Sequence, residues 1–197
     1  MKRTLSRELI VAEANKLAEK ETLHNLSWRG IARHLQVQPQ TLYHYFPSLG
    51  DLKAAVAEYQ RGQLERQLYA NLVPVSGADA LYVFAETIFT FAQNHPSFTE
   101  IMTDQIQGRN SSECVTDQQS TVVKILDDIL KPMIMDDDKR LQVKRFLLSS
   151  LFGYAKLSFS GFFAEQQATA DSLKTIVTFL IRAIPIDGQT PTSLQGD

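Results

Sequence analysis

Residues 27–52 constrain the fold more than any other part of the chain, because they have the pattern of two short helices joined by a tight turn. Ser27 supplies the hydroxyl expected at the N-cap of the first helix. Gln36 and Val37 occupy the turn. Pro39 suits the first turn of the second helix, where its missing N–H costs no hydrogen bond. The segment therefore predicts a helix-turn-helix motif.

Helical periodicity continues on both sides of this motif, and no segment has the alternation typical of a strand. A helix is expected before it at about residues 6–20, and Ser48 with Asp51 predicts a capped start for another that runs to about residue 71. The remaining helices are expected near residues 78–95, 96–107, 113–131, 138–163 and 169–184.

These elements predict an all-α fold in which an N-terminal three-helix head precedes a larger C-terminal helical domain. We expect the head to span residues 1–47 and the larger domain residues 48–186. Residues 187–197 contain almost no apolar side chains, so we expect a disordered tail there.

Composition and charge narrow the class of protein. The chain has no 18-residue apolar run and no signal-peptide pattern, and Cys114 has no second cysteine for a disulfide, so we expect a cytoplasmic protein without a membrane segment. The net charge is −2, yet residues 1–50 carry seven basic and four acidic side chains. This asymmetry favours a basic head that contacts DNA.

The second helix of the motif has a polar face opposite its inward anchors, Leu42 and Phe46. The side chains on that face are Gln38, Gln40, Thr41, Tyr43 and His44. Groups of this kind reach base edges and phosphates in a major groove, so double-stranded DNA is the leading candidate partner. For Tyr43 and Tyr45 the alternative is packing within the head. We favour DNA contact for Tyr43 and partial packing for Tyr45.

The head resembles the DNA-binding domain of the tetracycline-repressor (TetR) family of transcription regulators over about residues 5–60. The matching positions are Ile31, Ala32, Val37, Thr41, Leu42, Tyr43, Phe46, Ser48, Asp51 and Leu52. The resemblance implies a homodimer whose last two helices form a four-helix bundle with the partner. It also implies a ligand-binding C-terminal domain and a repressor that leaves its DNA when an unidentified small-molecule effector binds. A dimer with two reader helices predicts a near-palindromic operator.

Carried over to this chain, the resemblance implies base contacts from Gln38, Gln40 and Thr41 and a phosphate contact from Tyr43. His44 would meet phosphate or base, while Arg29 would attract DNA irrespective of its sequence. These six residues, together with the helix N-terminal amides near Gly50, are the DNA-binding groups that we predict.

Three positions depart from the family pattern. Gln36 stands where the family often has glycine in the turn, and a left-handed conformation there costs about 1 kcal/mol. Glu21 replaces a common glycine after the first helix. Leu49 replaces a lysine that usually grips phosphate, which leaves the amides near Gly50 as the expected phosphate contact.

The larger domain is rich in phenylalanine, which fits either ordinary core packing or an apolar pocket for an apolar or aromatic ligand. The candidate pocket residues are Phe84, Ile88, Phe91, Phe98, Met102, Phe152 and Lys156. Glu86 and Lys156 are isolated charges in apolar stretches, and each marks either a polar point in a pocket or a solvent-facing position. Core packing for the phenylalanines and solvent exposure for the charges are the simpler interpretations.

Two stripes predict a dimer interface. The small residues Ser149 and Gly153, followed by Leu157, recur every four residues and would let two helices approach closely. Leu173, Val177 and Leu180 form an apolar stripe on the last helix. Close packing within one subunit is the alternative for the first stripe.

We find no catalytic constellation, cofactor motif or metal-ligand spacing, and residues 136–138, three aspartates, are better explained as a helix start. The chain is therefore predicted to be a dimeric regulator, most simply a repressor, and not an enzyme. The alternatives are a DNA-binding regulator controlled by a protein partner or by no small ligand, and a helical-bundle carrier with a vestigial head.

Overall fold

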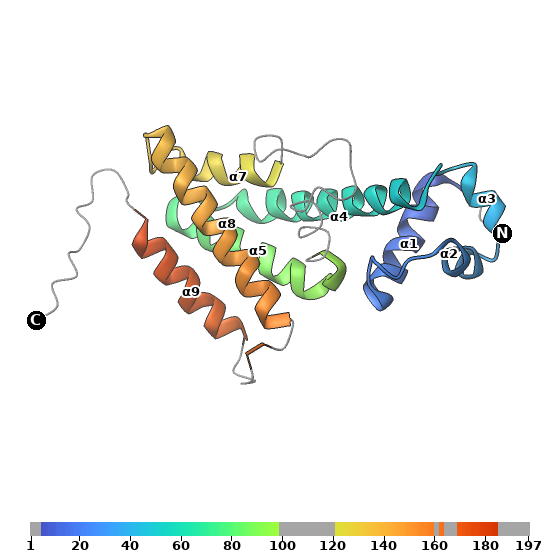
Figure 1. Ribbon diagram of the computed structural model, residues 1–197. Helices are drawn as coiled ribbons and strands as arrows, with labels where there is room; N and C mark the ends of the chain where they lie inside the picture. Colours follow the sequence, from blue (N-terminus) through green and yellow to red (C-terminus); the bar gives the residue numbers. More distant parts are fainter. Residues whose placement is uncertain (1–4, 99–120, 160–161, 164–168, 185–197) are drawn as a thin grey trace, which may run out of the picture. The chain divides into compact units, whose positions relative to one another are not determined.

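The computed structural model describes residues 5–98, 121–159, 162–163 and 169–184, and helices are its only regular elements in these ranges (Figure 1). The predicted all-α fold is confirmed. None of the helices described is long and apolar enough to cross a membrane.

The chain forms two compact units. Among the described residues, 5–64 and 92–98 belong to the first unit, and 65–91 together with those from 121 onward belong to the second. These units are groups of residues that pack together. The boundary that we predict between residues 47 and 48 stays a prediction.

The first unit contains α1 (Arg7–Glu21), α2 (Trp28–Leu35), α3 (Pro39–Tyr43) and the start of α4 (Leu49–Leu72). Their apolar faces enclose one core, in which Ile10, Ile31, Leu42, Phe46 and Leu52 are completely buried. The predicted inward anchors of the reader helix, Leu42 and Phe46, are therefore confirmed. The core fixes α3 from behind and leaves its other face to solvent.

Hydroxyl caps begin the helices at the predicted places. The Ser27 Oγ accepts a hydrogen bond from the Gly30 N–H at 3.2 Å. The Ser48 Oγ accepts one from the Asp51 N–H at 3.1 Å, and the Asp51 carboxylate accepts the Ser48 N–H at 3.0 Å. This reciprocal pair is the predicted capping box of α4, and each such cap is worth about 1 kcal/mol.

Among the residues that the structure describes, two other than glycine have positive φ. Gln36, the C-cap of α2, has φ 57° and ψ 41°, so the left-handed turn expected there is present. After α1, Thr22 has φ 87° and ψ 152°. Only glycine visits this second region readily, so Thr22 is the more strained position.

The second unit contains the end of α4, most of α5 (Gly77–Asn94), α7 (Thr121–Leu130), α8 (Asp137–Phe159) and α9 (Thr169–Ala183). Of the helix expected at 96–107, residues 96–98 are helical and the others lie outside the described residues, as do residues 113–120 of the next one. The expected tail at 187–197 also lies outside the described residues.

The aspartates of residues 136–138 begin α8, as predicted. The Asp136 Oδ1 accepts a hydrogen bond from the Lys139 N–H at 2.9 Å, and Asp137 forms an ion pair with Arg140. The Arg140 Nε also donates to Asp127 of α7 at 3.0 Å, and its Nη1 donates to the Ile134 carbonyl at 3.0 Å. The start of α8 is thus tied to α7 through Arg140.

Asp127 is the acidic centre of this contact, because Lys144 also donates to its Oδ1 at 2.5 Å. Burial pushes the pKa of Asp127 upward, but the hydrogen bonds from Lys144 and Arg140 outweigh it and hold the pKa below its usual value. Asp127 therefore stays ionised while it joins α7 to α8.

Candidate nucleic-acid interface

The outward face of α3 presents the predicted base-contacting side chains on a fixed support. Gln38, Gln40 and His44 are exposed, and Thr41 is half-buried. Pro39 stands at the first position of α3 and Gln38 at its N-cap. A short polar helix held by two buried anchors is the arrangement that a major groove admits.

The Tyr43 side chain is packed on one side and exposed on the other. Its ring lies 4.9 Å from the ring of Trp28 between centroids, at 47°, so α3 packs on the start of α2. The side chain is nevertheless 52% exposed. The Trp28 ring therefore supports a tyrosine whose remaining surface faces solvent, and contact with DNA stays a prediction.

Tyr45 is partly packed, as predicted. Its hydroxyl donates to the Leu5 carbonyl at 3.0 Å, and its own carbonyl accepts a hydrogen bond from the Arg7 Nη1 at 2.8 Å. The Arg7 guanidinium also lies over the Phe46 ring, 4.1 Å from its centroid. The N-terminus of α1 is thus tied to the end of the reader motif.

The amides that we predict to bind phosphate lie in the N-terminal turn of α4, and phosphate binding there stays a prediction. Gly50 is half-buried there, and a Cβ added to it would lie 3.4 Å from the Ser48 Oγ. Leu49 packs against the head core, which explains why an apolar residue suits this position. Arg29 is exposed in the first turn of α2.

Sequence reasoning missed a buried polar cluster in the same unit, here called the Gln60 cluster (Asn15, Glu19, Gln60, His95 and Ser97). The Gln60 Nε2 lies 2.7 Å from the Asn15 Oδ1, 2.8 Å from the Glu19 Oε1 and 2.6 Å from the Ser97 Oγ. The His95 Nδ1 lies 2.9 Å from the same Glu19 oxygen. The cluster links α1 with α4 and with residues 95–97.

A signal for this cluster was present in α4. The buried positions of α4 recur every four residues as Leu52, Val56, Gln60, Leu64 and Leu68, each at most 1% exposed. Gln60 is the one polar residue of that series, and a polar residue on an apolar stripe needs a buried partner. The pattern could have predicted a partner for Gln60, although not which residues provide it.

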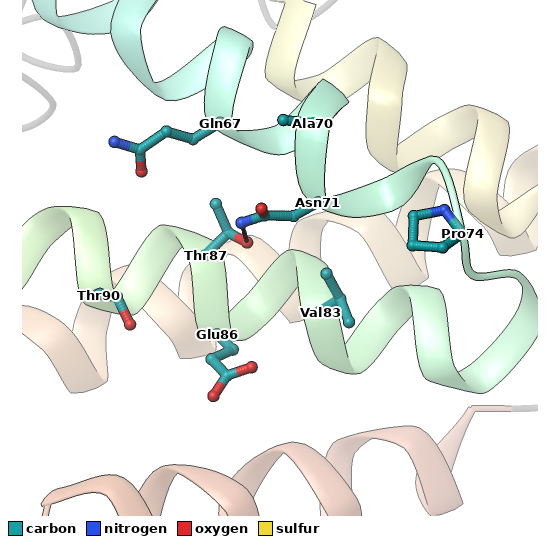
Figure 2. A pocket seen from close by; sticks show the side chains of 8 residues that line it. All are labelled: Gln67, Ala70, Asn71, Pro74, Val83, Glu86, Thr87 and Thr90. Atoms are coloured by element: carbon teal, nitrogen blue, oxygen red, sulfur yellow. Dashed lines mark hydrogen bonds between the residues drawn. The ribbon is translucent and has the colours of Figure 1, made fainter.

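The second unit contains a pocket of about 450 Å³ between α4 and α5 (Figure 2). It is lined by Gln67, Ala70, Asn71, Pro74, Val83, Glu86, Thr87 and Thr90. None of the predicted pocket residues is among them, but Glu86, singled out for its isolated charge, is. The Asn71 Nδ2 donates to the Thr87 Oγ1 at 3.1 Å and so joins the two helices.

The predicted pocket residues occupy other places. Phe84, Ile88 and Phe91 are core residues of the second unit, each at most 1% exposed, and Phe98 is buried in the first unit. Phe152 is half-buried and Lys156 is exposed. Met102 lies outside the described residues. Core packing therefore accounts for the four buried side chains, and a ligand role for the set stays a prediction.

The two predicted dimer stripes differ in exposure. Ser149, Gly153 and Leu157 of α8 are exposed, and a Cβ added to Gly153 would meet no atom within 4 Å. The α9 stripe behaves differently, since three of its side chains are already buried within their own subunit. Those residues are Leu173, Val177 and Leu180. Another face of α9 is open to solvent, and Phe179 is 65% exposed there.

Comparison with known proteins assigns the chain to a family. The family model described as tetracyclin repressor-like, C-terminal domain, matches residues 81–183, and the model of bacterial regulatory proteins of the tetR family matches residues 10–56. The chain belongs to the TetR family. TetR-family proteins are transcription regulators, and the resemblance first seen in the head therefore extends through the larger domain.

Individual relatives of this TetR-family chain are distant. It is 24% identical over 177 residues to the uncharacterized HTH-type transcriptional regulator YobS of Bacillus subtilis (strain 168), with 89% of this chain and 91% of that protein covered. The regulator SCO7222, a TetR from Streptomyces coelicolor, has a TM-score of 0.73 at 16% identity, over 92% of this chain and 98% of that one. The structure of BioQ with its double-stranded DNA operator has a TM-score of 0.61 at 17% identity, and the match covers 90% of this chain and 99% of that one. These structures share its fold.

Proposed function

We propose that this TetR-family protein is a homodimeric repressor that binds a near-palindromic operator and leaves it when a small molecule binds the larger domain. The observation that carries the proposal is the exposed polar face of α3, with Gln38 and Gln40 projecting from a helix that Leu42 and Phe46 hold rigidly. A structural neighbour with the same fold, BioQ, has been seen with its DNA operator.

Dimerisation is supported by apolar surface on α8 and α9. Leu157 is 40% exposed and Phe179 is 65% exposed, and large exposed apolar side chains of this kind are available to a partner surface. Two copies of α3 would then read half-sites separated by about 34 Å or a multiple of it. Ligand control requires a ligand that binds the released state more tightly than the DNA-bound state.

The test is fluorescence anisotropy with the DNA immediately upstream of the coding region of this protein and with random DNA of equal length, across a salt series. We expect tighter binding to the upstream DNA, with an affinity that falls steeply as salt rises. Gln40→Ala should weaken upstream binding by about tenfold, the value of one good base contact, and leave random DNA almost unaffected.

Two further variants sharpen this test. Gln142→Ala removes an exposed glutamine of α8 and should change neither affinity. Tyr43→Phe keeps the ring against Trp28 but removes the hydroxyl, so it should weaken both DNAs alike if the hydroxyl meets a phosphate. Equal affinity for the two DNAs, unchanged by Gln40→Ala, would contradict the assignment of α3 as the reader at this operator.

A further inference from the structure

We propose that the pocket between α4 and α5 binds a small organic cation, an ammonium or guanidinium group on a short apolar stem, with Glu86 as its counter-ion. The proposal deepens the proposed function, and it rests on that function only for the claim that such a cation is the effector. The binding step itself depends on the second unit alone, to which every lining residue belongs.

The segment that forms most of the pocket carries an unbalanced negative charge. Between residues 67 and 94, Asp79 and Glu86 are the only charged side chains, and both are acidic. Within the described part of the chain, no cation pairs with the Glu86 carboxylate and no donor bonds to it. Burial raises the pKa of the Tyr82 hydroxyl, and the nearby charge of Glu86 raises it further. A cation in the pocket would meet a carboxylate that no described cation neutralises.

The lining of the pocket is largely polar. Polar side chains from both helices line it, the Asn71–Thr87 hydrogen bond crosses from one helix to the other, and the Glu86 carboxylate lies on the side of α5 away from Asn71 (Figure 2). Since Asn71 donates through its Nδ2, its Oδ1 is left to accept a hydrogen bond from a ligand. The apolar part of the lining, Ala70, Pro74 and Val83, suits a short hydrocarbon stem.

The lining also indicates the kind of cation. Proteins hold quaternary ammonium groups on the faces of aromatic rings, and none of the described residues that line this pocket is aromatic. A carboxylate with nearby amide and hydroxyl oxygens instead suits a cation that carries N–H donors, and a guanidinium can pair with a carboxylate through two parallel hydrogen bonds. A volume of about 450 Å³ falls in the range of small-ligand sites.

The experiment is calorimetric titration of the full chain with three probes that share an n-butyl stem. These probes are n-butylguanidinium, the neutral n-butylurea and the quaternary n-butyltrimethylammonium. We expect n-butylguanidinium to bind about tenfold more tightly than either of the others, because only it combines charge with N–H donors. In an NMR spectrum the side-chain amide signals of Gln67 and Asn71 should shift as it binds.

Two variants assign the binding to this pocket. Glu86→Gln keeps the size of an exposed side chain but removes its charge, and should weaken n-butylguanidinium by about tenfold. Asp79→Asn removes the other acidic charge of α5, outside the lining, and should leave the affinity unchanged. Equal binding of n-butylurea, or an equal loss in both variants, would overturn the proposal.

Operator affinity, measured separately, distinguishes this inference from the proposed function. If operator binding is intact and no probe binds at the pocket, the inference fails and the DNA reader stands. If n-butylguanidinium binds through Glu86 without changing operator affinity, the cation site stands and its role as the effector site fails.

Discussion

Replacing Thr22 with glycine should stabilise the protein. Thr22 has φ 87° and ψ 152°, a region that costs a residue with a Cβ about 1–3 kcal/mol. Glycine gives up about 0.4–1 kcal/mol of this gain because it makes the unfolded chain more flexible. The Thr22 side chain is exposed, so little packing is lost, and its N–H keeps the hydrogen bond to the Ala18 carbonyl at 2.9 Å. The net gain should be about 1 kcal/mol.

Thermal unfolding followed by circular dichroism measures this effect, and for a chain of this size we expect Tm to rise by about 2–4 °C. Thr22→Ala is the matched control, because it shortens the side chain but keeps the Cβ that causes the strain. Gln36→Gly provides a scale, since its φ of 57° and ψ of 41° lie in the milder left-handed region and its gain should be smaller. A Tm for Thr22→Gly at or below that of Thr22→Ala would refute the strain argument.

Two other predictions concern stability and assembly. Asp127→Asn should destabilise the protein by about 1–2 kcal/mol at pH 7, because the two α8 cations lose their charged partner. The pKa of Asp127 is lower in the folded protein than in the unfolded chain, where it is about 3.9, so the ion pairs of Asp127 stabilise the fold above that pH and lose this effect as the pH falls below it. The Tm difference between Asp127→Asn and the wild type should therefore shrink towards pH 3. A difference that stays constant with pH would count against this role. Phe179→Glu should raise the dimer dissociation constant by about tenfold or more in sedimentation analysis, whereas Met135→Glu, which charges another exposed apolar side chain, should not. Equal effects of the two substitutions would argue against a seam at Phe179.

Local signals predicted the head well. The serine caps at Ser27 and Ser48, the proline at the start of α3 and the left-handed Gln36 all depend on residues within about four positions of each other. Such signals act through the backbone nearby, so they can be recognised without the rest of the fold. The strained backbone at Thr22 was not predicted, because helix ends are set by small differences in hydrogen bonding.

Features that depend on distant partners were harder to predict. An apolar stripe on α9 fits both a core and an interface, and only the tertiary packing shows that Leu173, Val177 and Leu180 are covered by their own subunit. The phenylalanines suggested an apolar cavity, whereas the pocket described lies among polar residues and includes Glu86. Hydrophobicity predicts that a side chain is buried, but not which neighbour buries it.

Gln60 sets the register of α4 against α1. The buried stripe on α4 repeats every four residues. If α4 slid along its axis by one helical turn, most aliphatic side chains of the stripe, such as Val56 or Leu64, could take the place of another aliphatic side chain at little cost in free energy. The same slide would move the Gln60 amide among hydrocarbon and bring an aliphatic side chain against the Glu19 carboxylate. Each buried polar group left without a partner costs about 1–3 kcal/mol. A single glutamine thus gives a repetitive helix one axial position, and the helix that begins at the Ser48–Asp51 capping box cannot settle a turn out of place.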